Sequence, residues 1–209
     1  MNIAHIDELD RIEMDDGFVW RPVRRRFGIR AFGVNAYSPR EAGAQVVEEH
    51  TENTYGHEEI YLVLRGRALF TVDGNEHELG PGELVFLRDP QLKRGAVGLT
   101  DDTVVLAIGA KPGVAHEPSA WEWMFASLPA ARAGDWAEAI RISEEGLADQ
   151  PDNPGLLYNL ACWESQGGRS LDALLHLQRA VALDERFRGY AATDTDFDPI
   201  RNEPGFPTV

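Results

Sequence analysis

Three residues in the first third of the chain, His50, His57 and Glu59, carry side chains that bind divalent transition metals. His57, Glu59 and Tyr61 alternate along an apolar segment, so on a strand they lie on one face. His50 ends the preceding apolar segment and would reach them across the loop 51–56. The pattern predicts a three-ligand metal site with open coordination positions, as catalytic metals need. The alternative is that His57 and Glu59 form a hydrogen-bonded pair and His50 is a solvated loop residue.

A second group of residues, Tyr61, Arg88, Lys93 and Arg94, is suited to binding a small ligand. We expect the three cations to lie on or near two facing strands. There they would donate charge-assisted hydrogen bonds to the carboxylate or phosphate of a small anionic molecule. The alternative is a solvated strand edge, where charges prevent unwanted sheet pairing.

The elements that must position these residues are short strands. Segments rich in β-branched and aromatic residues alternate with Gly, Pro, Asn or Asp about every ten residues, which is typical of a barrel or sandwich. Asp73-Gly74 predicts a tight hairpin, and Pro81-Gly82 marks a second turn. The predicted strands are 29–37, 44–50, 58–64, 68–72, 84–87, 95–99 and 103–108.

The pattern changes after residues 111–113, where Ala, Leu, Glu and Arg with apolar spacings of three and four predict helices. Gly134 and Gly168 begin corresponding segments 34 residues apart, as in a repeat of helical hairpins. Pro129 is expected to kink or shorten the first helix, because proline lacks the backbone donor. The predicted helices are 120–133, 136–149, 154–166 and 170–184.

The strand region resembles the cupin family. Glu59 and Gly66 fit the end of its first motif, and the Pro81-Gly82 turn that leads into a strand fits the start of its second. The resemblance implies a jelly-roll barrel, often dimeric, with a divalent metal held by three His and one Glu. Here Asn53, Tyr55 and Lys93 stand at the His positions, so the implied metal site is degenerate.

The helical region resembles tetratricopeptide repeats, with Tyr158 and Ala161 on one helix and Ala173 and Ala180 on the next. The resemblance implies contacts with a protein partner or self-association. The expected fold is therefore α+β: a double-stranded β-helix barrel followed by an all-α domain of helical hairpins. The expected divisions are an N-terminal extension (1–27), the barrel (28–114), two repeats (119–186) and a C-terminal capping tail (187–209).

Composition excludes some partners. With 35 acidic and 20 basic residues, the formal charge of −15 opposes binding to nucleic acid and to anionic membranes. The single cysteine, Cys162, lies in an apolar helical segment and is expected to pack in a core. No signal-like segment and no stretch of 18 apolar residues is seen, so we expect a cytoplasmic protein without an anchor.

The favoured function is binding of a small ligand, of unassigned specificity, by a cupin-like barrel joined to a helical interaction module. The alternative is an isomerase or dioxygenase that acts on a small acidic metabolite through one divalent transition metal. A third option is a barrel whose interior is filled by Tyr61, Phe70 and Phe86, which would leave the helices as the functional surface. The sequence leaves open whether the chain is an enzyme.

Overall fold

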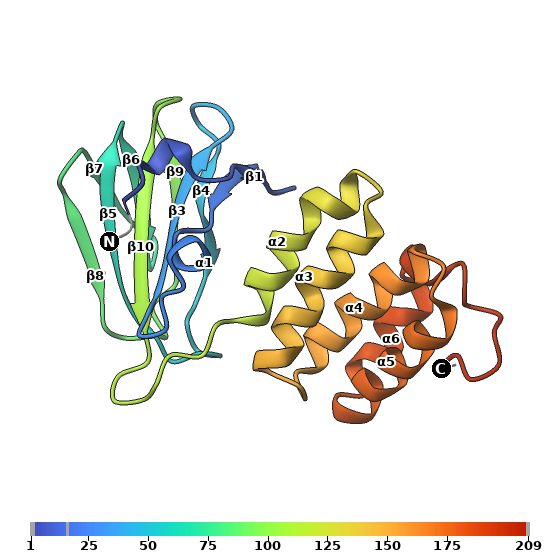
Figure 1. Ribbon diagram of the computed structural model, residues 1–209. Coiled ribbons are helices and arrows are strands. Elements are labelled where there is room, and N and C mark those ends of the chain that lie inside the picture. The colour runs from blue at the N-terminus through green and yellow to red at the C-terminus, as the bar shows by residue number, and fades with distance from the viewer. Residues whose placement is uncertain (1–2, 16, 208–209) are drawn as a thin grey trace. The chain divides into compact units, whose positions relative to one another are not determined.

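The described chain, residues 3–15 and 17–207 of a computed structural model, divides into an N-terminal unit of strands, Met1–Pro118, and a C-terminal unit of helices, Ser119–Val209 (Figure 1). Among the described residues, no helix combines the length and the apolarity needed to cross a bilayer.

Ten strands of the first unit form two antiparallel sheets. The six-stranded sheet has the order β1-β2-β3-β10-β5-β8, and the four-stranded sheet has the order β4-β9-β6-β7. The strands are β1 Ile12–Glu13, β2 Phe18–Arg21, β3 Gly33–Pro39, β4 Gln45–His50, β5 Glu58–Arg65, β6 Ala68–Val72, β7 Asn75–Leu79, β8 Leu84–Leu87, β9 Arg94–Gly98 and β10 Val104–Ala110. The short elements η1 (Ile6–Glu8) and α1 (Val23–Phe27) complete this unit.

The sequence predicted seven of these strands, and β1, β2 and β7 were missed. The β6–β7 hairpin turns at Asp73 and Gly74, whose φ angles of 46° and 78° are those of the predicted tight turn. The sequence of β7, Asn75–Leu79, is mostly polar and exposed because β7 is an edge strand of the four-stranded sheet. It therefore lacks the apolar alternation by which the other strands were found.

The N-terminal residues belong to the sheet. Strand β2 pairs with β3, and Trp20, opposite Tyr37, is completely buried. Residues 1–27, expected to be an extension, thus supply two strands to the six-stranded sheet. The apolar core of the sandwich includes Val46, Val63, Phe70 and Val105.

The second unit contains the four predicted helices, α2 Ala120–Arg132, α3 Trp136–Asp149, α4 Pro154–Gln166 and α5 Ser170–Leu183. Helix α2 packs on α3 and α4 packs on α5, with Ala139, Ala161 and Ala173 fully buried. Pro129 does not shorten α2, which has 13 residues like α4 and continues to Arg132. The assignment of these hairpins to the tetratricopeptide family stays a prediction.

Residues after α5 pack back on the helical hairpins. They form α6 (Arg186–Thr193) and η2 (Thr195–Phe197), and Phe197 and Ile200 are completely buried in the helical core. The side-chain amide of Gln166 donates to the carbonyl of Asp196 at 2.9 Å. Cys162 is buried in the same core, as the sequence predicted.

Candidate functional site

Five ionisable side chains meet inside the sandwich where β4 ends and β5 begins. This ionic cluster consists of His50, Glu52, His57, Glu59 and Arg94. His50 and Arg94 are paired residues of β4 and β9 in the four-stranded sheet, and Glu59 belongs to β5 of the other sheet. Both sheets therefore contribute to one site.

The loop between β4 and β5 carries the remaining two members, Glu52 and His57. The amide of Glu52 donates to the carbonyl of Pro90 at 2.9 Å, and the amide of Gly56 donates to the carbonyl of Glu52 at 2.6 Å. Gly56 has a φ of 68°, which glycine adopts without the strain that a side chain would add. The loop is thus held in the turn that directs Glu52 toward the two histidines.

The carboxylate of Glu59 is the centre of the cluster. Its Oε2 atom accepts a hydrogen bond from the Tyr61 hydroxyl at 2.7 Å and lies 3.4 Å from Nε of Arg94 and 3.8 Å from Nε2 of His50. The Arg94 side chain is 0% exposed and that of Glu59 is 12% exposed. Burial in contact with Glu59 raises the pKa of the Tyr61 hydroxyl, so Tyr61 is a neutral donor.

Glu52 joins the two histidines. Its Oε1 lies 3.4 Å from Nε2 of His50, and its Oε2 lies 3.2 Å from Nδ1 of His57. Burial by itself would lower the pKa of His50, but the carboxylates of Glu52 and Glu59 outweigh burial and raise it to about 10. Burial would likewise raise the pKa of Glu52, but hydrogen bonds with His50 and His57 lower it to about 2. At neutral pH, His50 is therefore a cation and Glu52 an anion.

Several buried polar atoms beside the cluster form no hydrogen bond within the described chain. They are Nε and Nη2 of Arg94, Oδ1 of Asn35, and both ring nitrogens of His116. Asn35 on β3 and Tyr61 on β5 flank Ala107 of β10 in the sheet register, so they share the inner face. We call these residues, Asn35, Tyr61, Arg94 and His116, together with the ionic cluster, the inner polar surface.

His116 reaches this surface from the segment that follows β10. Its ring centroid is 6.0 Å from that of His57. The ring also packs against Gly33, where an added Cβ would come within 3.2 Å of the His116 Cε1 atom. Burial, with the nearby charge of His57, lowers the pKa of His116, so the imidazole is held neutral.

The structure brings five of the predicted site residues together: His50, His57, Glu59, Tyr61 and Arg94. His57 contacts Glu52 rather than pairing with Glu59.

The other two predicted ligand-binding residues lie on the outside of the sheets. Arg88 follows β8, is 82% exposed and lies 3.9 Å from Glu58. Lys93, next to the inward-facing Arg94, pairs with Glu49 and is 57% exposed. Phe86, expected as interior filling, is also half exposed. Arg94 is thus the only one of the three predicted cations that the structure places inside the sandwich.

Sequence reasoning missed Asn35, Glu52 and His116. Glu52 stands in a run of glutamates that was interpreted as hydrated surface, and His116 stands in an irregular segment without periodicity. Asn35 did give a signal, because it is a single amide between the apolar residues of a buried strand.

A divalent metal, which the cupin resemblance implies, has a partial match here. Donor atoms of His50, Glu52 and Glu59 lie within 4.8 Å of one another, and one imidazole with two carboxylates suits a divalent cation. However, the guanidinium of Arg94 lies 3.4 Å from the same oxygen of Glu59, and His50 carries a proton at neutral pH. A metal ion would therefore have to compete with the Arg94 guanidinium for that oxygen of Glu59 and displace the proton of His50.

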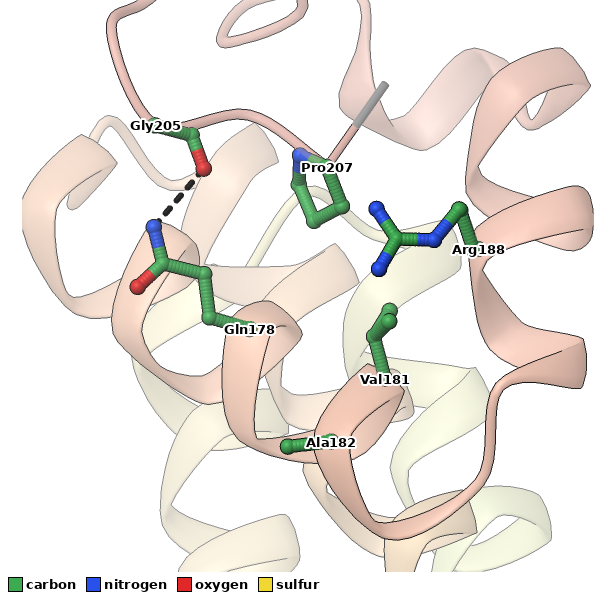
Figure 2. Close-up of a pocket in the computed structure, with 6 residues that line it drawn as sticks. All are labelled: Gln178, Val181, Ala182, Arg188, Gly205 and Pro207. Carbon is green, nitrogen blue, oxygen red and sulfur yellow. Dashed lines mark hydrogen bonds between the residues drawn. The ribbon is translucent and has the colours of Figure 1, made fainter. Parts of the chain in front are cut away.

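A separate pocket of about 290 Å³ lies in the helical unit (Figure 2). Its lining includes Val181 and Ala182 of α5 and Pro207 of the C-terminal segment, with Arg188 at one side. The Gln178 side-chain amide donates to the Gly205 carbonyl at 2.7 Å. The lining is mostly apolar and includes two polar side chains, Gln178 and Arg188, whereas the sandwich brings together a larger set of polar groups. The inner polar surface is therefore the better candidate site.

Several solved structures are similar to this chain. One is a sugar phosphate isomerase of the cupin superfamily from Silicibacter pomeroyi, with 21% identity over 53% of this chain and 76% of that one, at a TM-score of 0.45. Another is KdgF from Halomonas sp., with 19% identity over 49% and 86% of the two chains, at a TM-score of 0.40. A third is an RmlC-like cupin from Shewanella frigidimarina, with 15% identity over 54% and 94%, at a TM-score of 0.40. No curated protein sequence matches the chain.

The family comparison covers more than half of the chain. Residues 40–181, from the end of β3 to the last turn of α5, match the AraC-like ligand-binding domain. The cupin-like sandwich described above is the fold expected of such a domain. This chain therefore belongs to the family of AraC-like ligand-binding domains.

Proposed function

We propose that the sandwich binds a small, neutral molecule with several hydroxyl groups, such as a sugar or polyol, at the inner polar surface. The supporting observation is the set of buried polar atoms without hydrogen bonds on Asn35, Arg94 and His116. A buried polar group left without a partner costs about 1–3 kcal/mol. A ligand that supplies those partners removes this cost.

The charges of the site favour a neutral ligand. Glu52 and Glu59 are balanced by Arg94 and the protonated His50. An anion would meet two carboxylates, and a cation would meet a buried guanidinium. The expected anionic ligand relied on Arg88, Lys93 and Arg94, but Arg88 and Lys93 lie outside the sandwich and Arg94 pairs with Glu59. Hydroxyl groups both donate and accept, so they match a surface that offers carboxylates, imidazoles, an amide and a guanidinium.

The test is a binding panel of neutral pentoses, hexoses and polyols, together with the corresponding sugar acids and phosphates. Binding is measured by thermal shift and by calorimetry. We expect a neutral member to bind, and Asn35→Leu and His116→Phe to weaken its binding at least tenfold. The matched control is His77→Phe, which alters an exposed histidine on β7. Exclusive binding of the acids or phosphates would contradict the proposal.

A metal-dependent enzyme is the second candidate, favoured by the grouping of His50, Glu52 and Glu59. Elemental mass spectrometry on protein loaded with iron, manganese, nickel or zinc separates the two candidates. The ligand-binding proposal expects less than a tenth of an equivalent of metal. About one equivalent, lost in Glu52→Gln and kept in Glu49→Gln, would establish the second candidate.

We also propose that the helical unit contacts another protein. Leu171 and Leu175 lie one turn apart on α5 and are 78% and 64% exposed. Residues four apart form a ridge on a helix surface, and such a ridge packs into the groove of another helix. The double variant Leu171→Ser, Leu175→Ser should no longer form the cross-links to a protein partner that the wild type forms, and its melting temperature should be unchanged. An unchanged cross-linking pattern would argue against this surface.

A further inference from the structure

Arg21, the last residue of β2, is a buried cation without an anionic partner. It is only 3% exposed, and its Nη1 atom donates a hydrogen bond to the hydroxyl of Ser38 at 2.6 Å. Its Nε atom is buried and forms no hydrogen bond within the described chain, and no described carboxylate forms an ion pair with the guanidinium. A buried charge is costly when it is unpaired, so buried cations in proteins normally meet an anion.

Arg21 and Ser38 lie on the outer face of the six-stranded sheet. Ser38 is three positions from Asn35 on β3, and this odd separation places the two side chains on opposite faces. Because Asn35 belongs to the inner polar surface, Ser38 and the guanidinium bonded to it lie on the other side of the sheet. The group is therefore separate from the candidate site described above.

Arg65 of β5 joins Arg21 on this outer face. Extending the register of β3 with β10 by one residue sets Ser38 opposite Val104, and Val104 pairs with Arg65. The charge of Arg65 acts on Arg21, as expected of two neighbouring guanidinium groups. The Nε atom of Arg65 is also buried and without a hydrogen bond in the part of the chain that the structure describes. Each arginine thus keeps one unused buried donor.

Asp7 shows what kind of group this face accepts. Its two carboxylate oxygens accept hydrogen bonds from the terminal nitrogens of Arg65, at 2.6 and 2.7 Å. The side chains of Asp7 and Arg65 are 44% and 41% exposed, so the group can be reached from solvent on their side. The carboxylate of Asp7 leaves the Nε atoms of both arginines without an acceptor.

We propose that Arg21, Ser38 and Arg65 bind the carboxylate of a small organic acid. Its oxygens would accept hydrogen bonds from the two Nε–H groups and from the Ser38 hydroxyl. The planar fork of a guanidinium matches a carboxylate, and hydrogen bonds between the two are strengthened by their charges. This site does not depend on the ligand proposed for the inner polar surface.

The charge of this face favours a ligand with one negative charge. The cations of the group are Arg21, Arg65 and Arg11; burial, followed by the repulsion of Arg11, lowers the pKa of Arg21. The carboxylates whose charges act on the two buried donors are those of Asp7 and Asp102. Three cations and two anions leave one net positive charge, although the whole chain carries −15. A single carboxylate balances this charge, whereas a phosphate dianion would exceed it.

The test is calorimetry with lactate and with succinate at constant ionic strength, with chloride as the reference anion. We expect one equivalent of acid to bind the full chain. Arg21→Met should weaken this binding at least tenfold. Asp7→Asn should strengthen it, because the change removes the carboxylate that competes for Arg65. Arg30→Met is the matched control, since it alters an exposed arginine, and it should leave binding unchanged.

Melting temperatures separate binding from a structural role. Arg21→Met replaces an unpaired buried charge with an apolar side chain, so the variant without ligand should melt no lower than the wild type. The acid should raise the melting temperature of the wild type but not that of Arg21→Met. Asn35→Leu, which alters the inner face, should keep this increase, so failure of the neutral-ligand proposal would be seen separately.

Three results would each overturn the proposal. The first is that neither the wild type nor Asp7→Asn binds an acid. The second is that Arg21→Met binds the acids as well as the wild type does. The third is that inorganic phosphate binds at these arginines more tightly than the acids do.

Discussion

Arg94 offers the sharpest perturbation of the site, because its guanidinium is completely buried against Glu59. Replacing Arg94 by Met keeps the aliphatic length of the side chain and removes the charge. Glu59 is then left as a buried anion with only Tyr61 and His50 for stabilisation. Breaking one side of a buried ion pair costs about 3–5 kcal/mol. Because two partners of Glu59 remain, we expect the lower value, about 3 kcal/mol, or roughly a hundredfold in the unfolding equilibrium.

The assay must report on the sandwich alone, since the chain has two units. Hydrogen exchange of β5 peptides in increasing urea gives the free energy of unfolding for that sheet. Lys93→Met, the matched control, removes an exposed charge on the neighbouring residue and should cost less than about 0.5 kcal/mol.

A second substitution tests whether the stability lost in Arg94→Met comes from the unpaired charge of Glu59. In the Arg94→Met, Glu59→Gln double variant, the unpaired charge is gone, so part of the lost stability should return. If Arg94→Met and Lys93→Met cost the same, or if Glu59→Gln restores nothing, the ionic cluster is not the interaction that we describe.

Three further predictions concern pH, packing and thiol reactivity. Because the folded pKa of His50 is about 10 and the unfolded value is 6.5, its protonation stabilises the fold fully below pH 6.5 and less as the pH rises toward 10. In urea denaturation, the free energy of unfolding of the wild type should therefore fall between pH 6.5 and 10, and that of His50→Gln should not. An equal dependence of the two free energies on pH would contradict the assignment. Gly146→Ala should lower the free energy of unfolding by about 1–3 kcal/mol, because the new Cβ would lie 2.8 Å from the Trp123 ring; an unchanged urea midpoint would refute this contact. Burial raises the pKa of the Cys162 thiol, so it should react with a thiol reagent only on unfolding, and fast labelling of native protein would show that this core is open.

Much of the fold follows from periodicity in the sequence. The apolar spacing that predicted the four helices of the second unit is local, and those helices lie within one residue of the expected bounds. The same holds for β5, where alternation correctly placed Glu59 and Tyr61 on one face. Strand β7 could not be found in this way, since neither of its faces contributes greatly to the core.

The site was less predictable because it depends on contacts between distant segments. The sequence grouped Arg94 with Arg88 and Lys93 as similar cations. Only Arg94 stands at a position whose side chain points into the sandwich, because side chains alternate between the two faces of a strand. Glu52 and His116 lie in loops. The directions of their side chains depend on turns and packing, and not on the periodic spacing of apolar residues that reveals strands and helices. A metal triad of His50, His57 and Glu59 was a reasonable expectation from residue types, but the guanidinium of Arg94 changes the charge of the site.

The most direct test of the account is nuclear magnetic resonance of two side chains, the Nε–H group of Arg94 and the amide of Asn35, during titration with a neutral sugar or polyol. Both groups belong to side chains that keep buried atoms without hydrogen bonds. We predict that both signals shift together, saturate at one equivalent and gain protection from exchange with water. Shifts confined to residues outside the inner polar surface, with these two signals unmoved by a bound ligand, would contradict the account.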